Sequence, residues 1–380
     1  MLGRVLVVLL LLLLLGSGSA VAQEMRGEMI WEETFGGEVL TASISPDGSH
    51  MAFGTKGNGA LYFYDINGTR LWDHPTGCPV FGSAVSENGE YVVQGAEKVR
   101  VFTREGAHDW QWDSGFFAYS VAVSPDGKYI VVGSDNKKVY LLERGVGEIW
   151  QNETVDDVRA VSISGDSEYI AAGAGNNVYL FARNGTLLWE NPTAKGISGV
   201  ALSPDGRLVA SGSQDYRVHL YDRASGDLLW EHKTGNRVHS VSVANDGTIA
   251  TGAEDRWLSL FSEAGEVIWR EKMTAKVSGV ALSEDGTSLA VATGSGGNRG
   301  FLYSLGVSVV EEPVPTAIIE TISTTETPQT RVTEEPRGEQ VAAAELEEIR
   351  EGIPLPALVA GGGVLVAVGA ALVLLGRRRK

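Results

Sequence analysis

The sequence has a single cysteine among its 380 residues, Cys78, so the chain cannot form an internal disulfide bond. We predict that Cys78 is buried and structural, with a free or an intermolecular thiol as the alternatives. Stability must then come from packed apolar surfaces. Basic residues are also scarce, because 31 Lys and Arg stand against 48 Asp and Glu, a formal net charge of −17. Such a negative net charge disfavours nucleic acid and anionic membrane surfaces as partners of the protein surface as a whole.

Motifs that carry catalytic chemistry are missing as well. The chain has no HExxH metal motif, no GxSxG nucleophile motif, no phosphate-binding P-loop and no GxGxxG after a strand-like segment. The six histidines lack the paired spacing of metal ligands; they are His50, His74, His108, His219, His232 and His239. We therefore predict no catalytic residue, no cofactor and no metal.

No window shows the apolar period of an amphipathic helix. Instead, a unit of about forty residues recurs seven times, most clearly in residues 197–230. Each copy has an alternating apolar run, a Ser-Pro-Asp-Gly type of turn, a second run ending in Gly-Ser or Gly-Ala, a third run, a glycine-containing turn, and an apolar pair followed by Trp. Alternating runs bounded by such turns predict short strands joined as hairpins.

Two markers keep the same spacing along the chain, 41, 38, 40, 39, 41 and 39 residues. They are the turn glycines Gly48, Gly89, Gly127, Gly206, Gly247 and Gly286, with Ser167 in the fourth copy, and the tryptophans Trp31, Trp72, Trp110, Trp150, Trp189, Trp230 and Trp269. A repeat near forty residues with four short strands is typical of a β-propeller. One such unit cannot bury both of its faces alone, so neighbouring units must stack.

The ends of the repeat array indicate how the ring closes. The seventh copy loses its Trp, whereas Met29, Ile30 and Trp31 precede the first turn. We predict an all-β, seven-bladed β-propeller over residues 23–306, in which this N-terminal strand completes the last blade.

Two parts of the repeat resemble known families. The Ser-Pro-Asp-Gly turn followed by Gly-Ser resembles WD-repeat propellers, and Tyr221–Trp230 is similar to the tryptophan-docking segment of pyrroloquinoline-quinone-type propellers. The resemblance covers about residues 28–306 and implies an exported, membrane-anchored prokaryotic form, archaeal forms included. Quinoprotein dehydrogenases carry an adjacent cysteine pair near their cofactor, and this chain has only Cys78, so quinone binding is not implied.

The segments outside the repeats predict export and anchoring. Residues 1–22 have the charged start, apolar run and Ala-Val-Ala site of a signal peptide, with an uncleaved anchor as the alternative. Residues 307–353 are acidic and rich in Thr and Pro, which predicts a disordered, solvated stalk, either bare or O-glycosylated.

Residues 354–376 contain no charge and are long enough for one transmembrane helix. The basic tail 377–380 predicts a cytoplasmic C-terminus and an extracellular propeller. The arrangement also resembles a prokaryotic C-terminal sorting signal, in which the span is cut off. All 48 acidic residues lie in residues 23–353, whereas five of the 31 basic residues lie outside it, so this exported part has a net charge of −22.

In propellers, the loops from the outer strand to the next inner strand and from the second to the third strand share one face. Copies one to three place acidic and aromatic residues there, namely Glu32, Glu33, Asp73, Asp113, Phe116 and Phe117. Later copies place basic and aromatic residues there, and we predict that they form an anion-accepting ligand face: Lys195, Tyr216, Lys233, Arg237, Arg256, Trp257, Lys272, Lys276 and Arg299. The alternative is scattered solubilising charge, with Trp257 packed between blades.

Three Asn-x-Thr sequons predict N-glycosylation at Asn67, Asn152 and Asn184. Asn67 and Asn184 also suit hairpin turns, and Asn152 is expected in a loop, which makes it the stronger candidate. Asp135, Asp215 and Asp255, between second and third strands, are predicted to be turn formers.

Together these features predict a single-pass membrane protein that displays a non-enzymatic propeller at the cell surface. We expect it to act as an interaction scaffold for a protein or glycan at the cell envelope. The alternatives are a propeller enzyme, either a quinone-dependent dehydrogenase or one acting on polysaccharide, and a structural spacer in the envelope.

Overall fold

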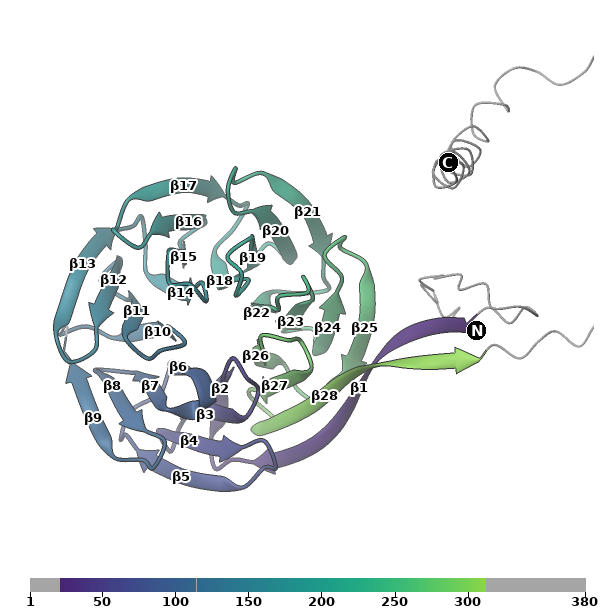
Figure 1. Ribbon diagram of the computed structural model, residues 1–380, viewed down its shortest axis with the longest axis horizontal. Coiled ribbons are helices and arrows are strands. Elements are labelled where there is room, and N and C mark those ends of the chain that lie inside the picture. Colours follow the sequence, from purple (N-terminus) through teal and green to yellow (C-terminus); the bar gives the residue numbers. More distant parts are fainter. Residues whose placement is uncertain (1–20, 114, 312–380) are drawn as a thin grey trace, which may run out of the picture. The chain divides into compact units, whose positions relative to one another are not determined.

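The computed structural model describes residues 21–113 and 115–311. Over these residues, 28 strands form seven antiparallel sheets of four strands each, which stand as blades around a central axis (Figure 1). The prediction of an all-β, seven-bladed propeller is confirmed. The only helical element in the described ranges is the 3-10 turn Glu87–Gly89.

Six blades are built from four consecutive strands, innermost first. Blade 1 holds β2 (Glu38–Ile44), β3 (His50–Lys56), β4 (Ala60–Asp65) and β5 (Arg70–Pro75). Blade 2 holds β6 (Gly82–Val85), β7 (Tyr91–Gly95), β8 (Val99–Thr103) and β9 (His108–Trp112). Blade 3 holds β10 (Ala118–Val123), β11 (Tyr129–Ser134), β12 (Lys138–Glu143) and β13 (Gly147–Glu153).

Blade 4 holds β14 (Val158–Ile163), β15 (Tyr169–Ala174), β16 (Asn177–Ala182) and β17 (Leu187–Pro192). Blade 5 holds β18 (Ile197–Leu202), β19 (Leu208–Ser213), β20 (Arg217–Asp222) and β21 (Leu228–Lys233). Blade 6 holds β22 (Val238–Val243), β23 (Ile249–Ala253), β24 (Trp257–Phe261) and β25 (Val267–Lys272).

Blade 7 joins the two ends of the array. It holds β26 (Val277–Leu282), β27 (Ser288–Thr293), β28 (Arg299–Glu311) and, outermost, β1 (Val21–Thr34). Trp31 pairs with Leu302, so the predicted closure by the N-terminal strand is confirmed. The pairing continues past residue 306, where we expected the propeller to end, and the two strands leave the ring as a ribbon (Figure 1).

The core lies between blades, as stacking of incomplete units requires. In one buried cluster, Leu208 and Leu220 of blade 5 pack with Val238 and Val241 of blade 6. A glycine near the end of the second strand, present in blades 1 to 6, allows this close approach. A Cβ atom added to Gly212 would lie 2.6 Å from a methyl carbon of Val238.

The outer-strand tryptophans fasten each blade to the next. The Trp189 ring packs on Gly226 of the next blade, and its Nε1 donates a 2.8 Å hydrogen bond to the Arg223 carbonyl. The same indole-to-carbonyl bond recurs from Trp72, Trp150 and Trp230. Strand β1 takes part on both sides, because Trp269 packs against Gly27, and Trp31 packs against Gly68 of blade 1.

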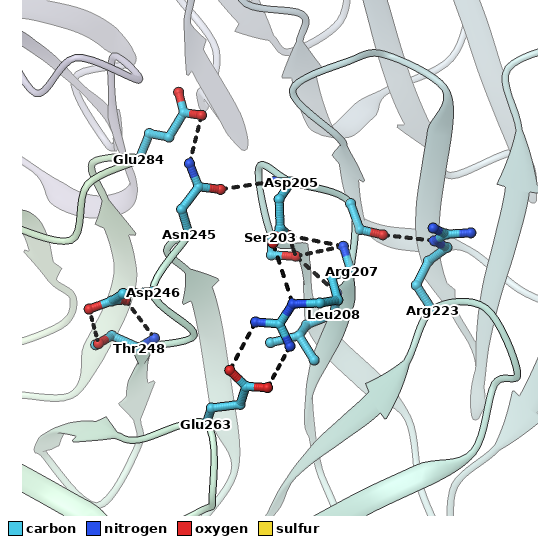
Figure 2. Close-up of polar contacts among 11 residues, drawn as sticks. Ser203, Asp205, Arg207, Leu208, Arg223, Asn245, Asp246, Thr248, Glu263 and Glu284 are labelled. Atoms are coloured by element: carbon cyan, nitrogen blue, oxygen red, sulfur yellow. Dashed lines mark hydrogen bonds and ion pairs between the residues drawn. The ribbon is translucent and has the colours of Figure 1, made fainter. Parts of the chain in front are cut away.

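The first turn of each blade is closed by its own polar residues, as Figure 2 shows for blade 5. The Ser203 hydroxyl donates to Asp205 at 2.5 Å, and Asp205 accepts the Arg207 backbone N–H at 3.0 Å. Gly206 between them has a φ of 70°. The Ser-Pro-Asp-Gly signature therefore reports turn chemistry and not a repeated catalytic site.

Four of the predicted segments fall largely outside the described residues: the signal peptide 1–22, the stalk 307–353, the span 354–376 and the tail 377–380. Residues 21–22 and 307–311 are the exceptions and belong to strands β1 and β28. Nowhere in residues 21–113 and 115–311 is there a helix with the length and apolar character needed to cross a membrane.

Candidate functional site

One face of the ring collects every predicted ligand-face residue. In an antiparallel blade, the ends of the second and outer strands and the starts of the inner and third strands lie on the same side. We call this side the groove face, and the opposite side, which carries the Ser-Pro-Asp-Gly turns, the turn face. All nine predicted residues lie at these strand ends or in the connections between them.

Several of these cations are already paired with carboxylates. Nζ of Lys276 lies 2.8 Å from Oε1 of Glu38, and Nη1 of Arg299 lies 2.6 Å from Oε1 of Glu32. Arg237 pairs more loosely, with its Nε 3.7 Å from Oε2 of Glu254. Partial burial alone would raise the pKa of Glu38, but hydrogen bonds from Lys276 and Ser295 lower it below the usual value.

The division of the face into acidic and basic halves is less sharp than the sequence indicates. Lys98 also lies on this face, and its Nζ is 2.8 Å from Oδ2 of Asp113. Lys138 donates a 2.9 Å hydrogen bond to Gln151 in the part expected to be acidic. We had not included either lysine among the face residues.

The remaining predicted residues surround two aromatic rings. Nζ of Lys195 lies 5.5 Å from the ring centroid of Tyr216, whose side chain is 37% exposed. Nζ of Lys272 lies 4.7 Å from the Trp257 centroid and donates a hydrogen bond to the Asp255 carbonyl. Arg256 and Lys233 are exposed at the surface of the same two blades.

Three grooves open at equivalent places on this face. Each lies between the outer strand of one blade and the third and outer strands of the next, and we name them groove 2/3, groove 4/5 and groove 5/6 after their blades. Their volumes are about 460, 280 and 240 Å³ respectively. The strand register makes their lining positions comparable one by one.

One cross-strand pair shows how the chemistry changes while the backbone does not. The pair is Tyr140 with Gln151 in groove 2/3, His219 with Glu231 in groove 4/5, and Ser259 with Arg270 in groove 5/6. Two residues before the first member stand Lys138, Arg217 and Trp257 respectively. At this pair of positions the propeller therefore presents the same hollow with a neutral, an acidic and a basic lining.

Groove 4/5 holds a self-contained cluster of ionisable groups. Nε2 of His219 lies 3.8 Å from Oδ2 of Asp215 and 3.7 Å from Oε2 of Glu231. Nε of Arg217 lies 3.3 Å from Oε1 of the same glutamate. Burial lowers the pKa of His219 despite these carboxylates, which favours the neutral imidazole. We had predicted Asp215 only as a turn former, a role it also fills by accepting the Arg217 backbone N–H.

Groove 5/6 brings Lys233 and Trp257 together with Arg270, which the sequence analysis missed. Cζ of Arg270 lies 3.7 Å from the Trp257 ring centroid. The indole is thus covered by two cations, Arg270 and Lys272. His232 packs on Phe261 in the same groove, with centroids 4.8 Å apart, and burial followed by the nearby Arg270 lowers its pKa. Arg270 follows Trp269 in outer strand β25 and pairs with Ser259, two residues after Trp257.

Groove 2/3 is the aromatic member of the set. The rings of Trp112 and Tyr140 meet edge to face with centroids 5.0 Å apart. The Asn136 amide donates to the Tyr140 hydroxyl, and Lys138 bonds to Gln151. Its charged lining residues are Lys138, Glu148 and Asp113, and Asp113 pairs with Lys98.

Around the central channel, serine hydroxyls of one inner strand form hydrogen bonds with the backbone of the next inner strand. Ser162 accepts the Leu202 backbone N–H at 3.0 Å, and Ser242 accepts the Leu282 N–H at 2.9 Å. A cavity of about 240 Å³ lies toward the turn face, where prolines of the first turns line it. These hydroxyls are engaged in holding blades together.

Two further expectations are corrected by the structure. Cys78 is partly exposed, in the connection between blades 1 and 2, and is not buried as predicted. Asn152 lies in strand β13, not in a loop, and its amide donates a 2.8 Å hydrogen bond to the Gly185 carbonyl of the next blade. Asn67 and Asn184 are exposed in hairpin turns, and their glycosylation stays a prediction.

Residues 21–113 and 115–311 contain no group of three or more His, Cys, Asp or Glu side chains placed to hold a metal ion.

Two overlapping stretches of the chain, residues 16–182 and 174–348, match the pyrroloquinoline-quinone-like repeat family described as outer membrane protein assembly factor BamB. No curated protein matches the chain.

Proposed function

The chain belongs to the propeller family described as outer membrane protein assembly factor BamB, and from that premise we propose that it is a non-enzymatic scaffold that binds protein partners at the cell envelope. The family description concerns assembly, which is a task of holding proteins together. A rigid ring with many loops suits such a role, although a fold alone does not assign it.

One observation carries the proposal: the framework residues repeat from blade to blade, whereas the groove linings do not. The indole-to-carbonyl bond of Trp189 recurs in three other blades, and the Ser203–Asp205 turn recurs in four others. The pairs His219–Glu231 and Ser259–Arg270 occupy one backbone position with unlike chemistry. Positions that serve only the fold have no reason to differ in this way, so the grooves are the part of the repeat available for recognition.

We further propose that the propeller is displayed outside a cell membrane. The apolar segment 354–376, the basic tail 377–380 and the export signal 1–22 support this placement. Limited proteolysis of intact cells should release the propeller, and its protection until the cells are lysed would contradict the placement.

Site-specific photo-cross-linking in living cells tests the scaffold. A benzophenone amino acid replaces Phe117 or Tyr216, both 37% exposed on the groove face. Matched controls carry it at Glu105 or Ala224, which are exposed on the turn face. We expect discrete protein adducts from the groove-face positions only. Equal capture at both faces, or none at either, would favour a structural spacer and refute the scaffold.

A further inference from the structure

Groove 5/6 lacks the glutamate that groove 4/5 carries at the equivalent position. We propose that it is the anchoring pocket for an acidic side chain, aspartate or glutamate, of the partner protein. This inference rests on the proposed function, because it presumes that the ligand is a protein, and it adds the chemistry by which that protein is held.

The cations of this groove have no carboxylate of their own. In the described part of the chain, no Asp or Glu lies within ion-pair distance of Arg270 or Lys233, although eight other arginines form ion pairs. Arg270 instead lies over Trp257, with Cζ 3.7 Å from the ring centroid. A guanidinium stacked through its flat face keeps its in-plane N–H groups for a planar acceptor, and a carboxylate is that acceptor.

Groove 4/5 provides an internal comparison. There the position of Arg270 is held by Glu231, the position of Trp257 is held by Arg217, and these two pair with each other at 3.3 Å. Groove 5/6 has exchanged the glutamate for an arginine, so the carboxylate is gone. Lys233, the last residue of its outer strand, adds a second cation where the equivalent strand β17 ends in a proline.

The one acidic residue that lines groove 5/6 is already engaged. The Asp255 carboxylate accepts the backbone N–H groups of Gly235 at 2.8 Å and Trp257 at 3.0 Å, so it serves the turn. The lowered pKa of His232 keeps that ring neutral at neutral pH. The remaining charge is positive, and a cavity of about 240 Å³ gives room for one acidic side chain.

A protein ligand fits this groove better than an acidic glycan. Sugars bind aromatic rings through open ring faces, whereas both Arg270 and Lys272 lie over the Trp257 ring. The groove offers a guanidinium held over the Trp257 ring, the exposed ammonium of Lys233 and a narrow space between blades. These features suit a single carboxylate on a short stem.

The test uses the full chain and three fluorescein-labelled heptapeptides that differ only in a central Glu, Gln or Lys, with neutral flanking residues. Fluorescence anisotropy at low ionic strength measures binding. We expect the Glu peptide to bind more tightly than the Gln peptide, and Arg270→Gln to weaken the Glu peptide roughly tenfold, as the loss of a charged hydrogen bond predicts. Lys56→Gln removes the same charge from an exposed position elsewhere on the groove face, at the end of strand β3, and should leave binding unchanged. Arg270→Glu should transfer the preference to a peptide with a central Lys.

Thermal unfolding of each variant confirms that the fold is intact, which the exposed position of Arg270 leads us to expect. Equal affinity for the Glu and Gln peptides, no detectable binding of the Glu peptide, or no effect of Arg270→Gln would each overturn the inference. A uronic-acid oligosaccharide that binds through Arg270 while the Glu peptide does not would overturn the choice of a protein ligand.

The inference and the proposed function fail separately. Groove-face cross-links that persist unchanged in Arg270→Gln leave the scaffold standing and remove the acidic anchor. A wild-type chain that yields no groove-face cross-link removes the scaffold, whatever the peptides do.

Discussion

Replacing Trp31 with alanine should destabilise the whole ring, because this residue carries the closure between blade 7 and blade 1. Its ring lies 4.9 Å from the Tyr64 centroid and 5.8 Å from that of Phe53, and it packs on Gly68. Each aromatic pair contributes about 1 kcal/mol beyond its buried area. Truncation of a fully buried Trp costs about 3–5 kcal/mol, and Trp31 is only partly buried, so we expect a loss of about 3 kcal/mol in the free energy of unfolding.

Urea unfolding monitored by circular dichroism measures this loss. Met29→Ala is the matched control on the same strand, since Met29 is 49% exposed and its truncation should change the free energy by less than about 0.5 kcal/mol. Trp31→Phe should recover part of the stability by keeping an aromatic ring in the seam. If Trp31→Ala is no more harmful than Met29→Ala, strand β1 does not close the ring and the reasoning from blade packing is wrong.

Three further outcomes follow from the geometry. Gly212→Ala should lower the free energy of unfolding by about 1–3 kcal/mol in urea titrations because its Cβ atom meets the next blade. Gly306→Ala is the control, and it should leave the free energy of unfolding unchanged because open space surrounds this position. A double-mutant cycle on Arg207 and Glu263 should give a coupling under about 1 kcal/mol that fades with salt, since both side chains are exposed; a larger, salt-independent coupling would contradict this. Burial lowers the pKa of His239 from 6.5, so the unfolded chain binds more protons near that pH and stability should fall on acidification below it. His239→Gln should flatten this dependence between pH 7 and pH 5, and an unchanged slope would argue against it.

The fold was largely readable from the sequence because its signals are local and repeated. Turn residues such as Gly206 sit in a backbone conformation that few other residues adopt, and the docking of Trp189 needs a glycine at one fixed distance along the chain. Each signal occurs about once per blade, so chance agreement is excluded by repetition. The closure by Trp31 followed from counting, since one blade lacked its last strand.

The candidate site was only partly readable. Lys233 and Trp257 were placed on the correct face, but Arg270 was missed because it lies inside strand β25 and not at the strand end, where the face residues were sought. Asn152 was assigned to a loop because its sequon was read without the bond to Gly185 of the next blade. The Asn152 contact joins residues 33 positions apart, and the Arg270 contact joins two different strands, so no pattern within one strand records them.

The amino-acid order by itself determined the number of blades, the chemistry of their turns and the need for an N-terminal strand in the last sheet. Those features depend on backbone conformation and on the period of apolar residues, which act within one repeat. Tertiary packing alone decided which charges neutralise each other: it gave Lys276 the carboxylate of Glu38 and left Arg270 on an indole ring. The reason is physical, since pairing depends on distances of a few ångströms. Lys276 meets Glu38 only once blade 7 lies beside blade 1, and Arg270 meets Trp257 only once strands β24 and β25 have paired.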